Sequence, residues 1–108
     1  MPADTMNLIR QGASVVFEQA FDRYARALAN RAADLKRKAP VALEANLAAE
    51  RERLRPRLLE ECAGALILLP HNANGDATNR ILRVAQAVIE GEPPKLAAER
   101  LITMLGVA

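Results

Sequence analysis

Four arginines occupy alternate positions in the most densely charged stretch of the chain, at Arg51, Arg53, Arg55 and Arg57. Arginine guanidinium groups form paired hydrogen bonds with phosphate oxygens and release the counterions of nucleic acids when they bind. Two further cations, Arg37 and Lys38, lie upstream. One hypothesis for function is therefore a nucleic-acid surface that consists of Arg51, Arg53, Arg55, Arg57, Arg37 and Lys38.

Acidic residues in the same stretch weaken the nucleic-acid hypothesis. Four glutamates lie within or beside the run of arginines, at Glu50, Glu52, Glu60 and Glu61. The chain carries 15 Lys and Arg against 13 Asp and Glu, and its only aromatic residues are one Tyr and two Phe. Dedicated nucleic-acid binders carry a stronger positive charge and aromatic side chains on which bases stack. We favour a solvated, ion-paired helix face and keep nucleic-acid binding as the alternative.

Residues suited to catalysis or to metal binding are scarce. His71 is the only histidine and Cys62 the only cysteine, and they are nine positions apart. No spacing matches a zinc or calcium motif, a glycine-rich phosphate loop or a nucleophile elbow. The sequence predicts no catalytic residue, no metal site, no cofactor and no small-molecule substrate. An enzyme that uses His71 and Asp76 is the remote third possibility.

The elements that would position these residues are helices. Ala, Leu, Arg and Glu, all good helix formers, dominate the composition, whereas the β-branched and aromatic residues typical of strands are few. A length of 108 residues suits one domain. We predict an all-α protein with a single helical domain over residues 1–108.

The first predicted helix spans residues 5–38. Asp4 or Thr5 is expected to cap it, and at roughly 100° per residue the aromatic side chains all fall on one apolar face. Gly12 is the weak point in its continuity, at a cost of about 1 kcal/mol relative to Ala. An unbroken helix of this length would overhang a compact monomer, so we expect a break near Gly12, an elongated molecule or a covering second copy.

Prolines and a loop divide the rest of the chain. Pro40 is expected to start the second helix and Pro56 to kink it into two pieces, 40–54 and 56–69. Asp76 is expected to cap a third helix, and Pro93-Pro94 to start a fourth. The two C-terminal helices are predicted at 77–90 and 94–105. The predicted fold is a small helical bundle with a long N-terminal helix, a Pro56-kinked second helix and two short C-terminal helices.

Charged residues inside the apolar arcs of the first two helices suggest a contact surface. Arg10 and Arg31 interrupt one arc, and Arg51 and Glu61 interrupt the other. Such residues either extend their stems over apolar surface or set the register of a helix–helix seam.

The leading hypothesis from these patterns is a non-enzymatic protein–protein interaction module, such as an adaptor, chaperone-like subunit or small regulator, that forms homodimers. The partner-binding residues predicted for it are Leu47, Arg51, Leu54, Arg55 and Arg57. The N-terminus lacks the pattern of a signal peptide, and no apolar run approaches the ~20 residues of a membrane span. We therefore expect a cytoplasmic protein without membrane contact.

Overall fold

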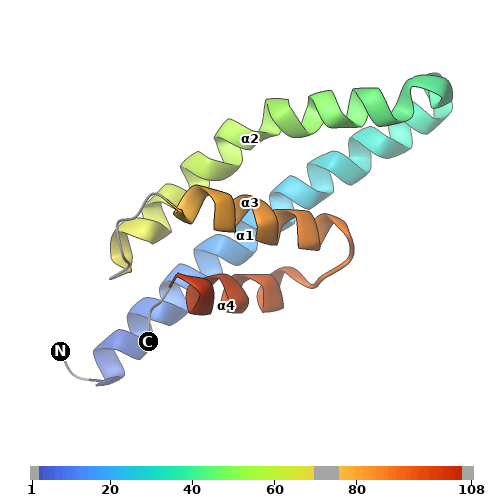
Figure 1. The fold of residues 1–108 in the computed structure, drawn as a ribbon. Helices are drawn as coiled ribbons and strands as arrows, with labels where there is room; N and C mark the ends of the chain where they lie inside the picture. Colours follow the sequence, from blue (N-terminus) through green and yellow to red (C-terminus); the bar gives the residue numbers. More distant parts are fainter. Residues whose placement is uncertain (1–2, 70–75, 106–108) are drawn as a thin grey trace.

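The structure, a computed structural model, describes residues 3–69 and 76–105. Within those ranges it contains four α-helices, one short 3-10 helix and no strand, which confirms the predicted all-α bundle (Figure 1). The elements are α1 (Ala3–Lys38), η1 (Pro40–Ala42), α2 (Leu43–Leu68), α3 (Ala77–Ile89) and α4 (Pro94–Met104). No helix in these ranges is both long and apolar enough to cross a membrane.

The first helix is continuous through Gly12 and decides the shape of the molecule. Its 36 residues correspond to about 54 Å at 1.5 Å per residue, which matches the longest dimension of the 55 × 24 × 18 Å molecule. The radius of gyration is 15.4 Å, against about 13 Å for a compact chain of this size. A long first helix was expected to break near Gly12, to give an elongated molecule or to be covered by a second copy. The single chain has the elongated shape.

The second helix is one helix and not two. α2 runs unbroken past Pro56, which lies in its interior and bends its path (Figure 1). Pro40 starts the short η1 turn, and α2 itself begins three residues later. The division into 40–54 and 56–69 was therefore wrong, whereas the kink at Pro56 was right.

Both predicted N-caps differ from the structure. α1 begins at Ala3, so Asp4 and Thr5 lie inside its first turn. There the negative carboxylate of Asp4 interacts favourably with the positive end of the helix dipole. Asp76 stands at the N-cap position of α3 but makes no side-chain capping bond. Its Oδ2 instead accepts a hydrogen bond from Arg80 Nε at 3.2 Å. An arginine one turn into the helix therefore competes successfully for the capping carboxylate.

The four helices divide the molecule into a base and an arm. α1 and α2 form an antiparallel hairpin, and α3 and α4 pack against the end that carries the chain termini (Figure 1). The main core includes α1 residues up to Leu28 and α2 residues from Leu54 onward. Residues 29–53, which we call the arm, extend beyond α3 and α4 as a two-helix hairpin.

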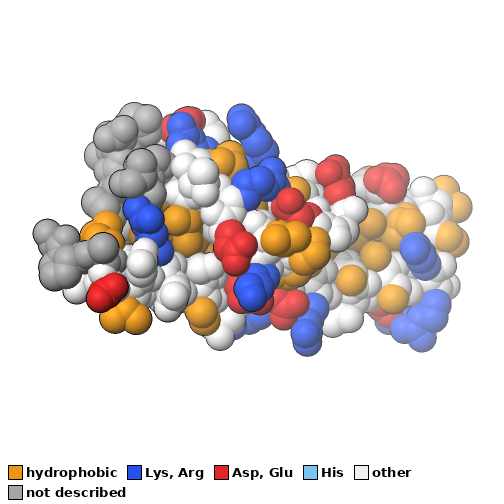
Figure 2. Space-filling model, turned by 90° about the horizontal axis from the view of Figure 1, so that it is seen from below, with side chains coloured by type: hydrophobic (Ala, Val, Ile, Leu, Met, Phe, Trp, Pro, Cys, Tyr) orange, Lys and Arg blue, Asp and Glu red, His pale blue; other side chains and the backbone are white. Residues whose placement is uncertain are grey.

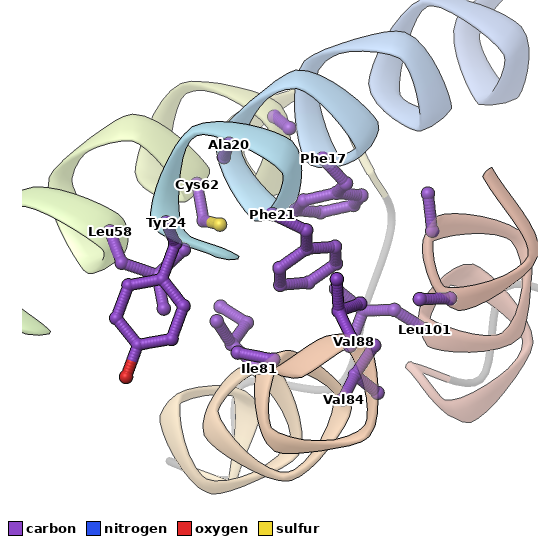
Figure 3. Close-up of a cluster of buried hydrophobic side chains, with 14 of the residues drawn as sticks. Phe17, Ala20, Phe21, Tyr24, Leu58, Cys62, Ile81, Val84, Val88 and Leu101 are labelled. Carbon is purple, nitrogen blue, oxygen red and sulfur yellow. The ribbon is translucent and has the colours of Figure 1, made fainter. Parts of the chain in front are cut away.

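The core of the base is built on two stacked aromatic rings of α1. Phe17 and Phe21 lie 6.4 Å apart between ring centroids, and both are fully buried. Ile81 of α3 and Leu101 of α4 reach the same cluster, and Cys62 enters it from α2 (Figure 3). No polar or charged residue of the described ranges is buried. Apolar burial therefore holds the helices together.

Replacement of Phe21 by Ala is expected to lower the free energy of unfolding by about 3 kcal/mol or more, the usual loss for a fully buried Phe. Chemical denaturation followed by circular dichroism measures this change. Val15→Ala, on the exposed side of the same helix, is the matched control and should be close to neutral. A neutral Phe21→Ala would contradict the core described above.

Two glycines inside helices face open space. A Cβ atom added at Gly12 or Gly64 would meet nothing within 4 Å. Gly91 differs because it follows α3 with a φ of 115°, in a region that side chains other than hydrogen strongly disfavour.

Gly12→Ala and Gly64→Ala are each expected to stabilise the chain by about 0.5–1 kcal/mol, because alanine reduces the backbone entropy lost on folding. Gly91→Ala should instead destabilise it by about 1 kcal/mol or more. Thermal unfolding of the three variants, compared at equal concentration, checks both signs. A destabilising Gly12→Ala would mean that α1 is not a continuous helix.

Candidate functional site

The surface has a hollow between α1 and α2, beside the Pro56 kink, with a volume of about 310 Å³. Its floor is largely apolar and is formed by Ala20, Tyr24, Ala27, Leu54 and Leu58. Its rim is polar and is formed by Arg23, Arg26, Asn30, Arg57 and Glu61. This volume is at the lower end of the range for ligand pockets, and the hollow fits one or two side chains of a partner.

The sequence creates this hollow in two ways. On α1, the short side chains of Ala20 and Ala27 leave space next to the ring of Tyr24. On α2, Pro56 lies between the two lining leucines, removes one backbone hydrogen bond and displaces the preceding turn. Small residues on one helix and a bend in the other therefore separate the helices at this level.

The hollow lies on the side of the hairpin that α3 and α4 leave uncovered. Its lining residues all belong to α1 and α2. At roughly 100° per residue, Arg23, Arg26 and Asn30 are turned away from Phe17 and Phe21, which contact the C-terminal helices. We call this uncovered side of the hairpin the open face.

One ion pair, between Arg23 and Glu61, joins the two helices at the rim of the hollow, and two others lie within single helices. Arg23 donates from Nε and Nη2 to Glu61 Oε2 at 3.2 and 3.0 Å, and Arg57 Nε donates to Glu61 Oε1 at 3.2 Å. Arg26 pairs with Asp22 at 3.0 Å. Three guanidinium groups thus share two carboxylates. Because these groups are largely exposed, each pair contributes about 0–1 kcal/mol to stability.

The five residues predicted to bind a partner do not form one surface. Leu54 and Arg57 line the hollow, whereas Leu47 is half-buried in the arm. Arg51 and Arg55 lie near the hydroxyl of Tyr24, whose pKa is raised by burial and lowered in part by these two cations. Figure 3 shows this hydroxyl at the edge of the core. Only Leu54 and Arg57 of the predicted set therefore belong to the candidate site.

The arginines of the nucleic-acid hypothesis are divided between two sides of α2. Positions two apart on a helix differ by roughly 200°, so Arg51 and Arg55 face one way and Arg53 and Arg57 the other. Arg53 pairs with Glu50 and lowers the pKa of that carboxyl through its hydrogen bond.

The other two cations of that hypothesis, in α1, are also paired. Arg37 and Lys38 bind Asp34 at 3.2 and 3.1 Å, and these contacts, led by the hydrogen bond from Lys38, lower the pKa of Asp34. Positive and negative side chains alternate along the face in Figure 2. Nucleic-acid binding stays a prediction, and this arrangement gives it no single basic surface.

Sequence reasoning missed the α1 side of the hollow. Arg23 and Arg26 are exposed on the outward side of α1, but nothing in the sequence pairs Arg23 with Glu61. That contact joins residues 38 positions apart and depends on how the two helices align. The one local signal was Arg57 and Glu61, four residues apart on one helix.

The charges predicted within the apolar arcs have different environments. Glu61 is held by the two arginines at the hollow, and Arg31 binds Asp34 at 3.3 Å. The charge of Arg51 partly offsets the rise in the pKa of Tyr24 that burial causes. The Nε atom of Arg10 is buried without a hydrogen-bond partner among the described residues. Arg10 and Arg51 fit the expectation of arginines whose side-chain stems cover apolar surface. Glu61 instead forms an ion pair with Arg23 across the hairpin.

Other chemistry receives no support within the described ranges. Residues 3–69 and 76–105 contain no group of three His, Cys, Asp or Glu side chains that could hold a metal ion. His71 lies outside these ranges. Cys62 is a free, buried thiol, and burial, assisted by Glu61, raises its pKa to about 12.

Comparisons of the chain with models of protein families, with curated proteins and with solved structures find no significant match. The case for a function therefore rests on the geometry of the open face and on the chemistry of the side chains it carries.

The Cys62 thiol is expected to resist modification in the folded chain. With a pKa of about 12 instead of the usual 9.0, about one thiol in 10⁴ is ionised at pH 8, and only the thiolate reacts. Labelling by a disulfide reagent should be at least about 100-fold slower in buffer than in denaturant. Equal rates would show that the thiol is accessible.

The same shift sets a pH dependence of stability. Because the folded pKa lies above the unfolded value, the unfolded chain loses its proton first, and stability falls as pH rises from about 9 to about 12. Cys62→Ala should show a smaller loss over this range in denaturant titrations.

Proposed function

We propose that this chain is a non-enzymatic protein–protein interaction module that self-associates, in the role of an adaptor, chaperone-like subunit or small regulator. The observation that carries the proposal is the uneven cover of the α1–α2 hairpin. α3 and α4 pack on one side of it, while the open face keeps a hollow with an apolar floor and an arginine rim. Concave apolar surface with a few convergent polar groups is typical of binding sites.

Exposed apolar side chains next to the hollow support the proposal. Leu68 is 51% exposed and lies two turns from Glu61 on the same side of α2, whereas Ile67, which is 83% exposed, points about a third of a turn further round the helix. Arg23 contacts Glu61 across the antiparallel hairpin, so a step of seven residues along each helix aligns Val16 with Leu68. This part of the open face is apolar on both helices, and a partner that covers it would gain about 25 cal/mol for each Å² buried.

The arm supports the same interpretation. Beyond Leu28 and Leu54 the hairpin has no third helix to cover it, and Leu35 is its one fully enclosed apolar side chain in residues 29–53. A hairpin that extends from a packed base offers contact area on both of its sides. It adds little apolar burial of its own, which favours a role in contacts over a role in stability.

Sedimentation velocity from low to high micromolar concentration tests self-association. We expect the wild-type chain to shift from monomer to dimer as concentration rises, and Ile67→Ser with Leu68→Ser to abolish that shift because the apolar contact is lost. Leu96→Ser is the matched control, since Leu96 is 54% exposed on α4, away from the open face. A wild-type chain that stays monomeric throughout would refute self-association.

A further inference from the structure

We infer that two copies of this chain associate through the outward sides of their α1 helices, which pack antiparallel with Asp22 of each copy against Arg26 of the other. This inference rests on the proposed function and specifies the partner as a second copy. The second copy lies along the α1 edge of the open face, where Arg26 also forms part of the rim of the hollow. The observations behind it are a heptad spacing, the side chains exposed at that spacing and the order of the charges among them.

A stripe with heptad spacing runs along α1 on the side opposite the core. The stripe consists of Leu8, Gly12, Val15, Gln19, Asp22, Arg26, Ala29 and Ala33. Its members are separated by four and three residues in alternation, and none of them is buried. At roughly 100° per residue they centre about half a turn from the buried Phe17, Tyr24 and Leu35. This is the spacing at which one helix packs along another in a coiled coil.

The side chains of the stripe suit close contact with another helix. Leu8 is 68% exposed and Val15 49% exposed, so the chain itself leaves both largely uncovered. Ala29 and Ala33 are small, and a Cβ atom added at Gly12 would meet nothing within 4 Å. Because the distance between packed helices depends on the side chains at their contact, these small residues let a second backbone approach. The two larger residues contribute apolar area to the same contact.

The charges of the stripe select an antiparallel pairing. In a parallel two-fold pair each residue meets its own counterpart, so Asp22 would face Asp22 and Arg26 would face Arg26. An antiparallel pair centred midway between these residues instead places Asp22 of each copy opposite Arg26 of the other. The pair that Asp22 and Arg26 form within one chain, at 3.0 Å, then joins its symmetry mate in a ring of alternating charges. Arg23, the nearest other cation, is bound to Glu61 of its own chain.

The charges also fix the register of the antiparallel pair. A shift by one heptad in either direction would place Asp22 opposite Gln19 or Ala33, and Arg26 opposite an apolar side chain. Such a shift would desolvate both charges without an opposite charge from the other copy, which is unfavourable. Only the register centred between Asp22 and Arg26 brings opposite charges together at both symmetric contacts.

The same register accounts for the exposed apolar residues of α1 and of the arm. It places Val15 opposite Ala33 of the other copy, so that the exposed valine is covered by a small side chain. It also brings Leu8 to the level of Pro40 of the other copy, next to Val41, which is fully exposed at the tip of the arm. The base of each copy thus lies against the arm of the other, and the arm gains cover that its own chain does not supply.

A charge exchange tests the pairing. Asp22→Arg alone and Arg26→Asp alone each place like charges opposite one another at both contacts, and each should raise the dimer dissociation constant at least about tenfold. An equimolar mixture of the two variants brings opposite charges together at both contacts and should restore association as a heterodimer. Sedimentation velocity with one variant fluorescently labelled follows all three samples. Recovery in the mixture also shows that both variants are folded.

A matched pair of substitutions controls for net charge. Arg83→Asp and Glu99→Arg make the same changes of charge at exposed positions on α3 and α4, and they should leave association unchanged. If the wild type dimerises but the two single variants associate as it does, or the mixture fails to recover, the α1 pairing is overturned while the proposed self-association stands. A wild-type chain that never dimerises overturns both.

Cross-linking tests the antiparallel register. A mixture of Val15→Cys and Ala33→Cys should form disulfide-linked heterodimers on mild oxidation, because the two positions lie opposite one another. Either variant alone should cross-link far more slowly, since its two new cysteines would lie about 27 Å apart at 1.5 Å per residue, well beyond the reach of a disulfide. Cys62 can remain in place because it is buried. A variant that cross-links as fast alone as in the mixture, on a non-reducing gel, would overturn the antiparallel arrangement.

Discussion

One constraint shapes the whole molecule: α1 carries a single apolar side, and that side must serve three other helices. Phe17 and Phe21 pack in one buried cluster with residues of the C-terminal pair, while Ala20 lines the hollow beside α2. The main core includes α1 residues only up to Leu28, so the later turns of this helix pack on α2 alone (Figure 1). Burial is therefore concentrated in the base, and both the arm and the open face follow from this shortage of covering helices.

Pro56 disturbs the regular packing of α2 against α1 next to the hollow. A proline in a helix interior costs about 3 kcal/mol when nothing compensates, yet α2 continues through it because Leu58, Cys62 and Ala65 are fully buried on the far side of the bend. The bend separates α2 from the small side chains of α1 and opens the hollow. Core packing on one side thus stabilises a distortion whose consequence appears on the other.

Periodicity made the helices predictable, and energetics explains where local rules failed. A cost of about 1 kcal/mol at Gly12 is small beside the burial of two phenylalanines on the same helix, so α1 stays continuous. The capping role expected of Asp76 was wrong because Arg80 competes for the same carboxylate. The contacts at helix ends depend on such small differences in free energy between competing hydrogen bonds, whereas the burial of long apolar stripes does not.

The candidate site was less accessible to sequence reasoning, because its residues meet only through tertiary register. Arginines at alternate positions look like a cluster in the sequence but separate by roughly 200° per step on a helix. The partner of Glu61 was Arg23, from the other helix of the hairpin. Leu54 and Arg57 line the hollow on either side of Pro56, which is the one feature of the hollow that is visible in the sequence.

The residues that stabilise the fold differ from those to which we assign the proposed recognition of a partner. The described ranges bury no charged side chain, and the ion pairs of the open face are exposed ones that contribute about 0–1 kcal/mol each. Those charges gain strength only when a partner excludes water from them, because Coulomb interactions grow as the local dielectric falls. Under the proposed function, substitutions at Arg57 or Glu61 therefore alter the preference for a partner without loss of the core, while Phe17 and Phe21 maintain the fold.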